Sequence, residues 1–165
     1  MVGGQSHEAV TWERKMSQKS PSGAPRKVSI VSRAAQSGAP AATLIGFSVS
    51  EVGEGRAVAT LEAGPQHANP MGTLHGGILC DIADAAMGLA FASTLSADES
   101  FTTLELNINF FRPVWNAQLR AEGKVLRRGK TIGFVECEIK DEKGALVAKA
   151  SSTCLVLRGD KAEGR

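Results

Sequence analysis

Apolar and polar positions alternate through most of the chain after residue 40, and this period of two predicts a protein built largely from β-strands. In residues 103–110 the apolar side chains would share one face of a half-buried strand: Leu104, Leu106, Ile108 and Phe110. Strands are expected at residues 45–52, 56–62, 103–110, 118–126, 132–140 and 145–157, with Gly53-Glu54-Gly55 as a hairpin turn. The last four strands follow one another through short connections, so we expect them to form an antiparallel meander.

One segment departs from this alternation, because residues 76–95 are almost entirely apolar and predict a long helix. Asp81 and Asp84 would each cost roughly 2.5–3.5 kcal/mol at the centre of a membrane helix, so we expect a helix buried inside a protein and no membrane span. A helix that is apolar nearly all round needs a surface that wraps it. The predicted class is α+β, a curved antiparallel sheet around one long central helix, with a second copy covering the remaining apolar surface of a homo-oligomer.

The length of 165 residues suits one folded domain. Residues 18–40 are rich in Ser, Pro, Gly and Ala, which resist regular packing. We therefore expect a flexible basic tail over residues 1–37, the domain over 38–158 and a C-terminal tail over 159–165. The net charge of +2 divides into +4 for residues 1–35 and −2 for the remainder, and a near-neutral body argues against nucleic-acid binding.

The cysteines and the N-terminal composition indicate the compartment. Cys80, Cys137 and Cys154 lie far apart with no CxxC pair, and the first fifteen residues carry charges without a continuous apolar segment. We expect a cytoplasmic protein with reduced cysteines. No metal site is expected, because His75, Cys80 and Asp84 lack the spacing of ligands on one face.

The candidate chemistry lies on and just before the predicted helix. At 3.6 residues per turn, Gly77, Asp81, Asp84 and Gly88 form one small, acidic stripe. Asp81 suits the positive N-terminal end of the helix. Asp84 lies deeper, where it is either a structural carboxylate or a general base or nucleophile whose pKa is raised by apolar neighbours.

The His75-Gly76-Gly77 sequence lies at the entrance to the helix, where backbone amides have no intrahelical partner. It is either a structural entry to the helix or a site that presents amides to a developing oxyanion.

The run Asn69-Pro70-Met71-Gly72-Thr73-Leu74-His75-Gly76-Gly77, followed by Asp84, resembles the N-x-x-G-x-x-H-G-G-x6-D pattern of the PaaI-type (phenylacetate-pathway) hotdog thioesterases. The resemblance spans about residues 38–158 and includes FTTLELNINFFRP and RRGKT. It implies a hotdog fold and hydrolysis of an aryl- or medium-chain acyl-CoA without a cofactor. It also implies active sites between protomers of a homotetramer built as a dimer of dimers.

Roles for individual residues follow from the same resemblance. Asp84 would be the catalytic carboxylate, Gly76 would offer its amide to the thioester oxygen, and Asn69 would orient the water or the carboxylate. His75 would hold the loop beside the oxyanion site, and Thr103 would help to place the water or the carboxylate. The candidates for substrate binding, including recognition of the CoA phosphates by basic side chains, are Gly77, Asp81, Arg112, Arg127, Arg128 and Lys130.

Two other functions stay open at this point. A hotdog hydratase or dehydratase would pair His75 with Asp84 to move a proton on a 3-hydroxyacyl thioester. A non-enzymatic acyl-CoA-binding regulator would use the basic tail for DNA, although that tail is short and contains no recognisable recognition helix.

Overall fold

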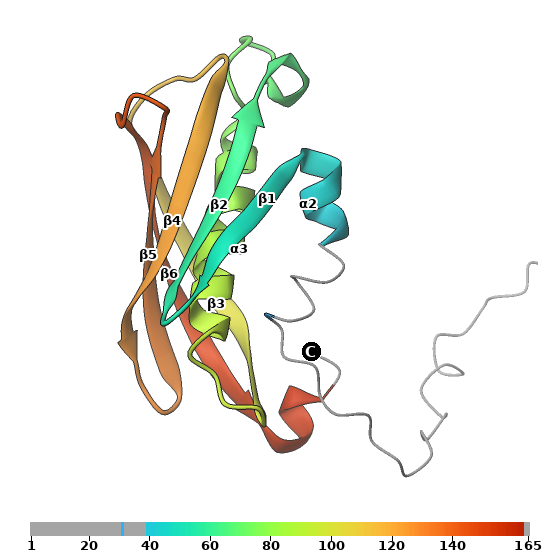
Figure 1. Ribbon diagram of the computed structural model, residues 1–165, viewed down its shortest axis with the longest axis vertical. Helices are drawn as coiled ribbons and strands as arrows, with labels where there is room; N and C mark the ends of the chain where they lie inside the picture. Colours follow the sequence, from blue (N-terminus) through green and yellow to red (C-terminus); the bar gives the residue numbers. More distant parts are fainter. Residues whose placement is uncertain (1–30, 32–38, 164–165) are drawn as a thin grey trace, which may run out of the picture.

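The computed structural model describes residue 31 and residues 39–163, and it shows a six-stranded antiparallel sheet with one long helix packed along it (Figure 1). The predicted α+β class and the central helix are confirmed. The predicted basic tail, apart from residue 31, lies outside the described residues. In chain order the elements are α2 Pro40–Ile45, β1 Phe47–Gly53, β2 Arg56–Ala63, η2 Pro65–His67, α3 Gly76–Ala92, β3 Glu99–Phe110, β4 Ala117–Arg128, β5 Ile132–Lys140, β6 Leu146–Arg158 and η3 Gly159–Ala162.

The order of strands in the sheet is β1-β2-β4-β5-β6-β3. The expected four-strand meander is therefore wrong for its first member, since β3 pairs with β6 and not with β4. The connection over residues 111–116 contains Pro113 and is too long for a tight hairpin. It carries the chain past the start of α3, where the amide of Leu74 donates to the carbonyl of Val114 at 2.7 Å.

The first strand and the C-terminal end of the packed region differ from the sequence-based bounds. Ile45, expected in the first strand, ends α2, a short helix with Pro40 in its first turn that the alternation pattern could not predict. After β6 the chain continues into η3, whose Ala162 is buried. The packed part thus extends to Ala162, four residues into the expected C-terminal tail.

The core lies between α3 and one face of the sheet. The helix contributes the buried side chains Leu79, Ile82, Ala83, Ala86, Met87, Ala90 and Phe91. Small residues allow the helix and sheet to approach closely. A Cβ at Gly123 on β4 would lie 2.5 Å from the Ala86 carbonyl oxygen, and one at Gly133 on β5 would overlap the Phe91 ring at 2.0 Å. The helix position is therefore fixed by glycines on the sheet.

Replacing Gly123 with alanine is expected to lower the free energy of unfolding by about 1–3 kcal/mol, because the added methyl group meets helix backbone that cannot move aside. Chemical denaturation of the purified protein measures the loss. The matched control is Gly53→Ala on β1, where a Cβ has no heavy atom within 4 Å. Equal stability of the two variants would contradict this account of helix packing.

Strand β3 contains a bulge that interrupts its alternation. Thr103 pairs with Cys154 of β6, whereas Glu105 pairs with Thr153, so Leu104 is an extra residue on β3. Leu104 is 55% exposed, which corrects its expected place on the buried face with Leu106 and Ile108. On both sides of the bulge, however, residues of β3 still face the helix.

The opposite edge of the sheet is also irregular. The register of β1 shifts between Ser50 and Gly53, and Glu51 has a φ of 52°. The strand is 7 residues long, against 12 for β3. The two edges therefore both carry an irregularity but differ in length.

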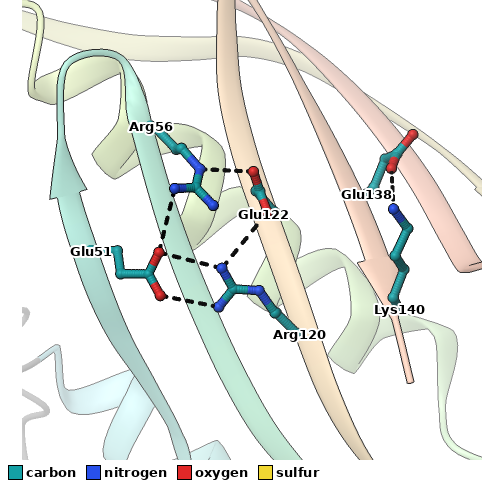
Figure 2. Close-up of polar contacts among 6 residues, drawn as sticks. All are labelled: Glu51, Arg56, Arg120, Glu122, Glu138 and Lys140. Carbon is teal, nitrogen blue, oxygen red and sulfur yellow. Dashed lines mark hydrogen bonds and ion pairs between the residues drawn. The ribbon is translucent and has the colours of Figure 1, made fainter. Parts of the chain in front are cut away.

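The face of the sheet that points away from α3 carries a network of ion pairs (Figure 2). Arg56 and Arg120 each contact both Glu51 and Glu122, and Lys140 contacts Glu138 at 2.8 Å. All these side chains are 40–49% exposed, so each pair adds little stability.

Within residue 31 and residues 39–163, none of the helices combines the length and apolarity needed to cross a membrane.

Candidate active site

The loop before α3 is organised by Asn69. Its Oδ1 accepts hydrogen bonds from the amides of Met71 at 2.9 Å and Thr73 at 3.3 Å, and its Nδ2 donates to Thr73 Oγ1 at 2.9 Å. The amide of Gly72, which has a φ of 81°, donates to the Asn69 carbonyl at 2.9 Å. In the single chain, Asn69 therefore shapes the loop that leads to His75.

The start of α3 separates the roles of His75, Gly76 and Gly77. His75 is the N-cap, and its Nδ1 accepts the amide of Gly77 at 2.9 Å. The amide of Ile78 donates to the His75 carbonyl at 3.0 Å. Among the described residues, the Gly76 amide has no acceptor within hydrogen-bond distance. Of the two glycine amides predicted to face substrate, only that of Gly76 is free, and it lies at the positive end of the helix.

A hollow opens beside this free amide. It is lined by Thr73, Leu74, Gly76, Leu79, Phe110, Phe111, Arg112, Pro113 and Val114. The ring of Phe110 lies against Gly76, where a Cβ would approach its Cζ to 3.1 Å. Phe110 and Phe111 are 52% and 55% exposed, so apolar surface is open to a ligand or a second subunit.

Asp84 lies two turns further along α3, on the side of the helix that faces β3. Thr103 Oγ1 donates to Asp84 Oδ1 at 3.4 Å and is the one donor to this carboxylate among the described residues. The side chain is exposed in the single chain, but the surrounding protein partly removes water from the carboxylate. This desolvation raises the pKa of Asp84, the Thr103 hydrogen bond lowers it, and the Asp81 charge raises it, with a net rise. A raised pKa is the property that a general base requires.

The structure brings together Asp84 with Thr103 and, separately, Gly76 with His75 and the Asn69 loop. Eight residues separate Gly76 from Asp84, which at about 1.5 Å per residue places them roughly 12 Å apart along the helix axis. A reacting carbonyl must lie about 3 Å from both the base or nucleophile and the oxyanion donor. These two groups of one chain cannot act on the same thioester.

The four basic candidates also divide into two places. Arg112 lines the hollow at the start of α3, whereas the guanidinium of Arg128 lies over the ring of Phe91 near the end of the helix, 5.4 Å from its centroid. Arg127 and Lys130 flank Arg128 in the same hairpin. The predicted basic group is therefore not a single surface in one chain.

Arg128 has a structural partner that the sequence did not indicate. It donates to Glu99 Oε2 at 2.7 Å, and Arg158 pairs with the other oxygen of the same carboxylate. Burial opposes ionisation of Glu99, but hydrogen bonds from the Ser96 amide, Arg158 and Arg128 hold its pKa below the ordinary value. This cluster ties the ends of β3, β4 and β6 together.

Two more polar residues near the site were missed at the level of sequence. His67 is buried, with its Nε2 donating to the Ile45 carbonyl at 2.7 Å and its Nδ1 accepting the Gly64 amide at 3.2 Å. Ser152 is 1% exposed on β6 and donates to the Glu105 carbonyl at 2.9 Å. The sequence could have identified Ser152, because it is the hydroxyl residue among alternate β6 positions that are otherwise small or apolar: Ala148, Ala150, Cys154 and Val156. Across residues 39–163, no three His, Cys, Asp or Glu side chains gather as metal ligands.

Comparison with known proteins places this arrangement. Residues 71–148, which include His75, Asp84 and Thr103, match the sequence profile described as Thioesterase superfamily. A protein of Saccharolobus solfataricus that carries a provisional esterase name is 41% identical over 105 residues, which are 64% of this chain and 74% of that protein. The chain belongs to the thioesterase superfamily. The predicted family and the enzyme class, a thioester hydrolase, are thereby confirmed.

Two further relatives of this thioesterase have more specific names. The 1,4-dihydroxy-2-naphthoyl-CoA hydrolase of Listeria monocytogenes is 29% identical and covers 71% of this chain and 95% of its own. The PaaI protein of the phenylacetic acid degradation operon of Escherichia coli has a similar structure, with a TM-score of 0.70 and 26% identity over 77% of this chain and 91% of that chain. These matches confirm the hotdog architecture.

Proposed function

We propose that this thioesterase hydrolyses an aryl- or medium-chain acyl-CoA to the free acid and CoA, with Asp84 as general base or nucleophile and the Gly76 amide as oxyanion donor. The observation that carries the proposal is the Asp84 carboxylate, which combines a raised pKa with a single hydroxyl donor from Thr103. A carboxylate held in this way has lone pairs free to accept a proton or to attack a carbonyl carbon.

In the general-base route, Asp84 takes a proton from water as the water oxygen adds to the thioester carbon. The negative oxygen of the tetrahedral intermediate accepts a hydrogen bond from the Gly76 amide, strengthened by the helix N-terminus. The carbon–sulfur bond then breaks, and the CoA thiolate takes up the proton held by Asp84. In the nucleophilic route, the Asp84 carboxylate attacks the thioester carbon and the carbon–sulfur bond breaks, releasing the CoA thiolate, which takes a proton from water. Water then hydrolyses the mixed anhydride to the free acid and regenerates Asp84.

A second subunit completes the site in this proposal. The roughly 12 Å between Gly76 and Asp84 along one helix is too great for a single thioester, so Gly76 of one protomer serves Asp84 of the other. Strand β3 is an edge of the sheet, and exposed Leu104 and Phe110 lie on it. We infer a homodimer through this region, paired further into a homotetramer in the cytoplasm.

The hollow beside Gly76 supports the proposed substrate class. Its wall of Leu79, Phe110, Phe111 and Val114 suits an apolar or aromatic acyl group. The names of the Listeria and Escherichia relatives, a naphthoyl-CoA hydrolase and a protein of phenylacetic acid degradation, support an aromatic acyl group. Arg112 at this hollow, or Arg127, Arg128 and Lys130 from another subunit, would contact the CoA phosphates.

The hydratase alternative is less well supported. It needs the His75 imidazole for proton transfer, but its Nδ1 caps the helix by accepting the Gly77 amide at 2.9 Å. The regulator alternative requires DNA binding by the tail, most of which lies outside the described residues. The confirmed enzyme class makes hydrolysis the function to test first.

The direct test follows thiol release from a panel of phenylacetyl-, hydroxybenzoyl-, naphthoyl- and medium-chain acyl-CoAs, with enoyl absorbance recorded in parallel. We expect thiol release without enoyl formation. Asp84 must be ionised to act as a base, so kcat/KM should rise with pH as the carboxyl loses its proton. Because the pKa of Asp84 is raised, the midpoint of this rise should lie above the ordinary Asp pKa of about 3.9. Absence of thiol release from every member, or a change in enoyl absorbance alone, would reject the proposal.

A further inference from the structure

The bulge in β3 decides where Thr103 points. Before it, Phe101 and Thr103 lie opposite Val156 and Cys154, and after it, Leu106 and Ile108 lie opposite Ser152 and Ala150. Directly opposed residues share a face of the sheet, and here that face is the buried one. Odd-numbered residues therefore face α3 before Leu104, and even-numbered residues face it afterwards.

If the same sequence paired with β6 without a bulge, strict alternation would put Thr103 and Leu106, three residues apart, on opposite faces. With Leu106 on the core, Thr103 would point away from α3 and could not reach Asp84. The 3.4 Å hydrogen bond from Thr103 to Asp84 therefore depends on the bulge. Bulges often have this effect of re-aiming a side chain beside an active site.

Two side chains of β6 contact the bulge: Thr153 Oγ1 donates to the exposed Glu105 Oε1 at 3.3 Å, and Ser152 bonds the Glu105 backbone. The Ser152 hydroxyl is 1% exposed and donates to the Glu105 carbonyl, the first residue after the bulge, at 2.9 Å. Its immediate neighbours on the buried face of β6 are Ala150 and Cys154, whose Sγ lies 4.0 Å from the hydroxyl. A buried hydroxyl needs a partner, and this one satisfies a carbonyl where the ladder is interrupted.

We propose that Ser152 is a positioning residue for the hydrolysis, because it holds the β3 bulge that turns Thr103 toward Asp84. The inference rests on the proposed function of Asp84 and extends it to a residue that does not contact substrate. Ser152 acts in two steps. Its hydroxyl holds the Glu105 carbonyl and so stabilises the bulge, and the bulge in turn directs the Thr103 hydroxyl toward Asp84.

The pKa of Asp84 is the quantity to measure, and three neighbouring groups influence it or respond to it. Asp81 faces Asp84 from α3, the Thr103 hydroxyl from β3 and the Cys154 thiol from β6. Burial raises the pKa of Cys154, and the Asp84 charge adds to that rise, so this thiol stays protonated near neutral pH. The Thr103 hydrogen bond lowers the pKa of Asp84, and its loss must raise that pKa further.

The experiment measures the Asp84 pKa by carboxyl-carbon NMR titration and kcat by thiol release in the full-length protein. Ser152→Ala is expected to raise the Asp84 pKa in the same direction as Thr103→Ala and to lower kcat about tenfold. In the Thr103→Ala background, Ser152→Ala should change neither quantity further, because its route to Asp84 is already lost.

The matched control is Ser100→Ala, which removes another buried serine hydroxyl on β3 that has no partner among the described residues. It should leave both the titration and kcat unchanged. If Ser152→Ala titrates like Ser100→Ala, or lowers kcat as strongly with Thr103 absent as with it present, Ser152 only packs β6 and the proposal is overturned. The NMR titration needs no turnover, so this failure is distinct from failure of the wild-type protein to hydrolyse acyl-CoA.

Discussion

Asp84→Asn is expected to lower kcat for a good acyl-CoA by about 10²–10⁴-fold, since the amide can neither accept the proton from water nor attack the thioester carbon. The variant should stay folded. Asparagine has nearly the same shape, and the carboxylate it replaces accepts one hydrogen bond, from Thr103, among the described residues. Steady-state thiol release, with single-turnover assays to separate chemistry from product release, measures the effect.

The stability of Asp84→Asn provides an independent check with a defined sign. Burial raises the pKa of Asp84 in the folded state, so ionisation is less favourable there than in the unfolded chain. The unfolded state thus loses its proton first as pH rises, and the folded state loses stability through that window. At neutral pH the neutral asparagine should melt no lower than the wild type.

Asp98→Asn is the matched control for this substitution, because it neutralises an exposed loop acid outside the site. Its kcat should equal that of the wild type. If Asp84→Asn turns over acyl-CoA at nearly the wild-type rate, and Asp98→Asn does so too, Asp84 is not the catalytic carboxylate and the proposed mechanism is refuted.

Gly76→Pro should lower kcat by about 10²–10³-fold, because it deletes the one free amide at the start of α3. The backbone accepts proline there. Gly76 is the first helical residue, and His75 has φ −67° and ψ 129°, within the range allowed before proline. Gly76→Ala adds a carbon at the same place beside Phe110 but keeps the amide, so the difference between the two variants reports the oxyanion donor.

Combining Gly76→Pro with Asp84→Asn in different subunits tests whether two chains share each site. If Gly76 of one protomer serves Asp84 of the other, a mixed dimer purified through two tags has one intact site and one doubly damaged site. It should recover about half of the wild-type activity, although both parents are nearly inactive. If each site lies within one chain, every site carries one lesion and the mixed dimer stays inactive.

The strands and the helix could largely be predicted from sequence, because apolar periodicity reports which residues are buried. It reports nothing about which strands are neighbours. The alternation after Thr103 identified β3 as a strand but could not show that it pairs with β6, nor that Leu104 is an extra residue in that pairing. Register depends on two strands together, and it fixes which way Thr103 points.

The candidate site was predictable in its residue types but not in its distances. The spacing from His75 to Asp84 identified both groups, whereas only the helix geometry shows that they are too far apart for one thioester. Arg112 and Arg128 looked equivalent as positive charges near turns. The structure separates them because Arg128 is held by Glu99 and Phe91, residues distant in sequence.

The unequal edges of the sheet have a consequence for self-association. A sheet with two long, regular borders can add copies at both and grow into an open-ended fibre. Here the β1 border is 7 residues long, and Glu51, at a φ of 52°, disrupts it with a charged kink. We therefore expect a strand from another molecule to continue the ladder along the longer β3 edge. Two copies joined in this way would leave only their short β1 edges outermost, which disfavours further growth.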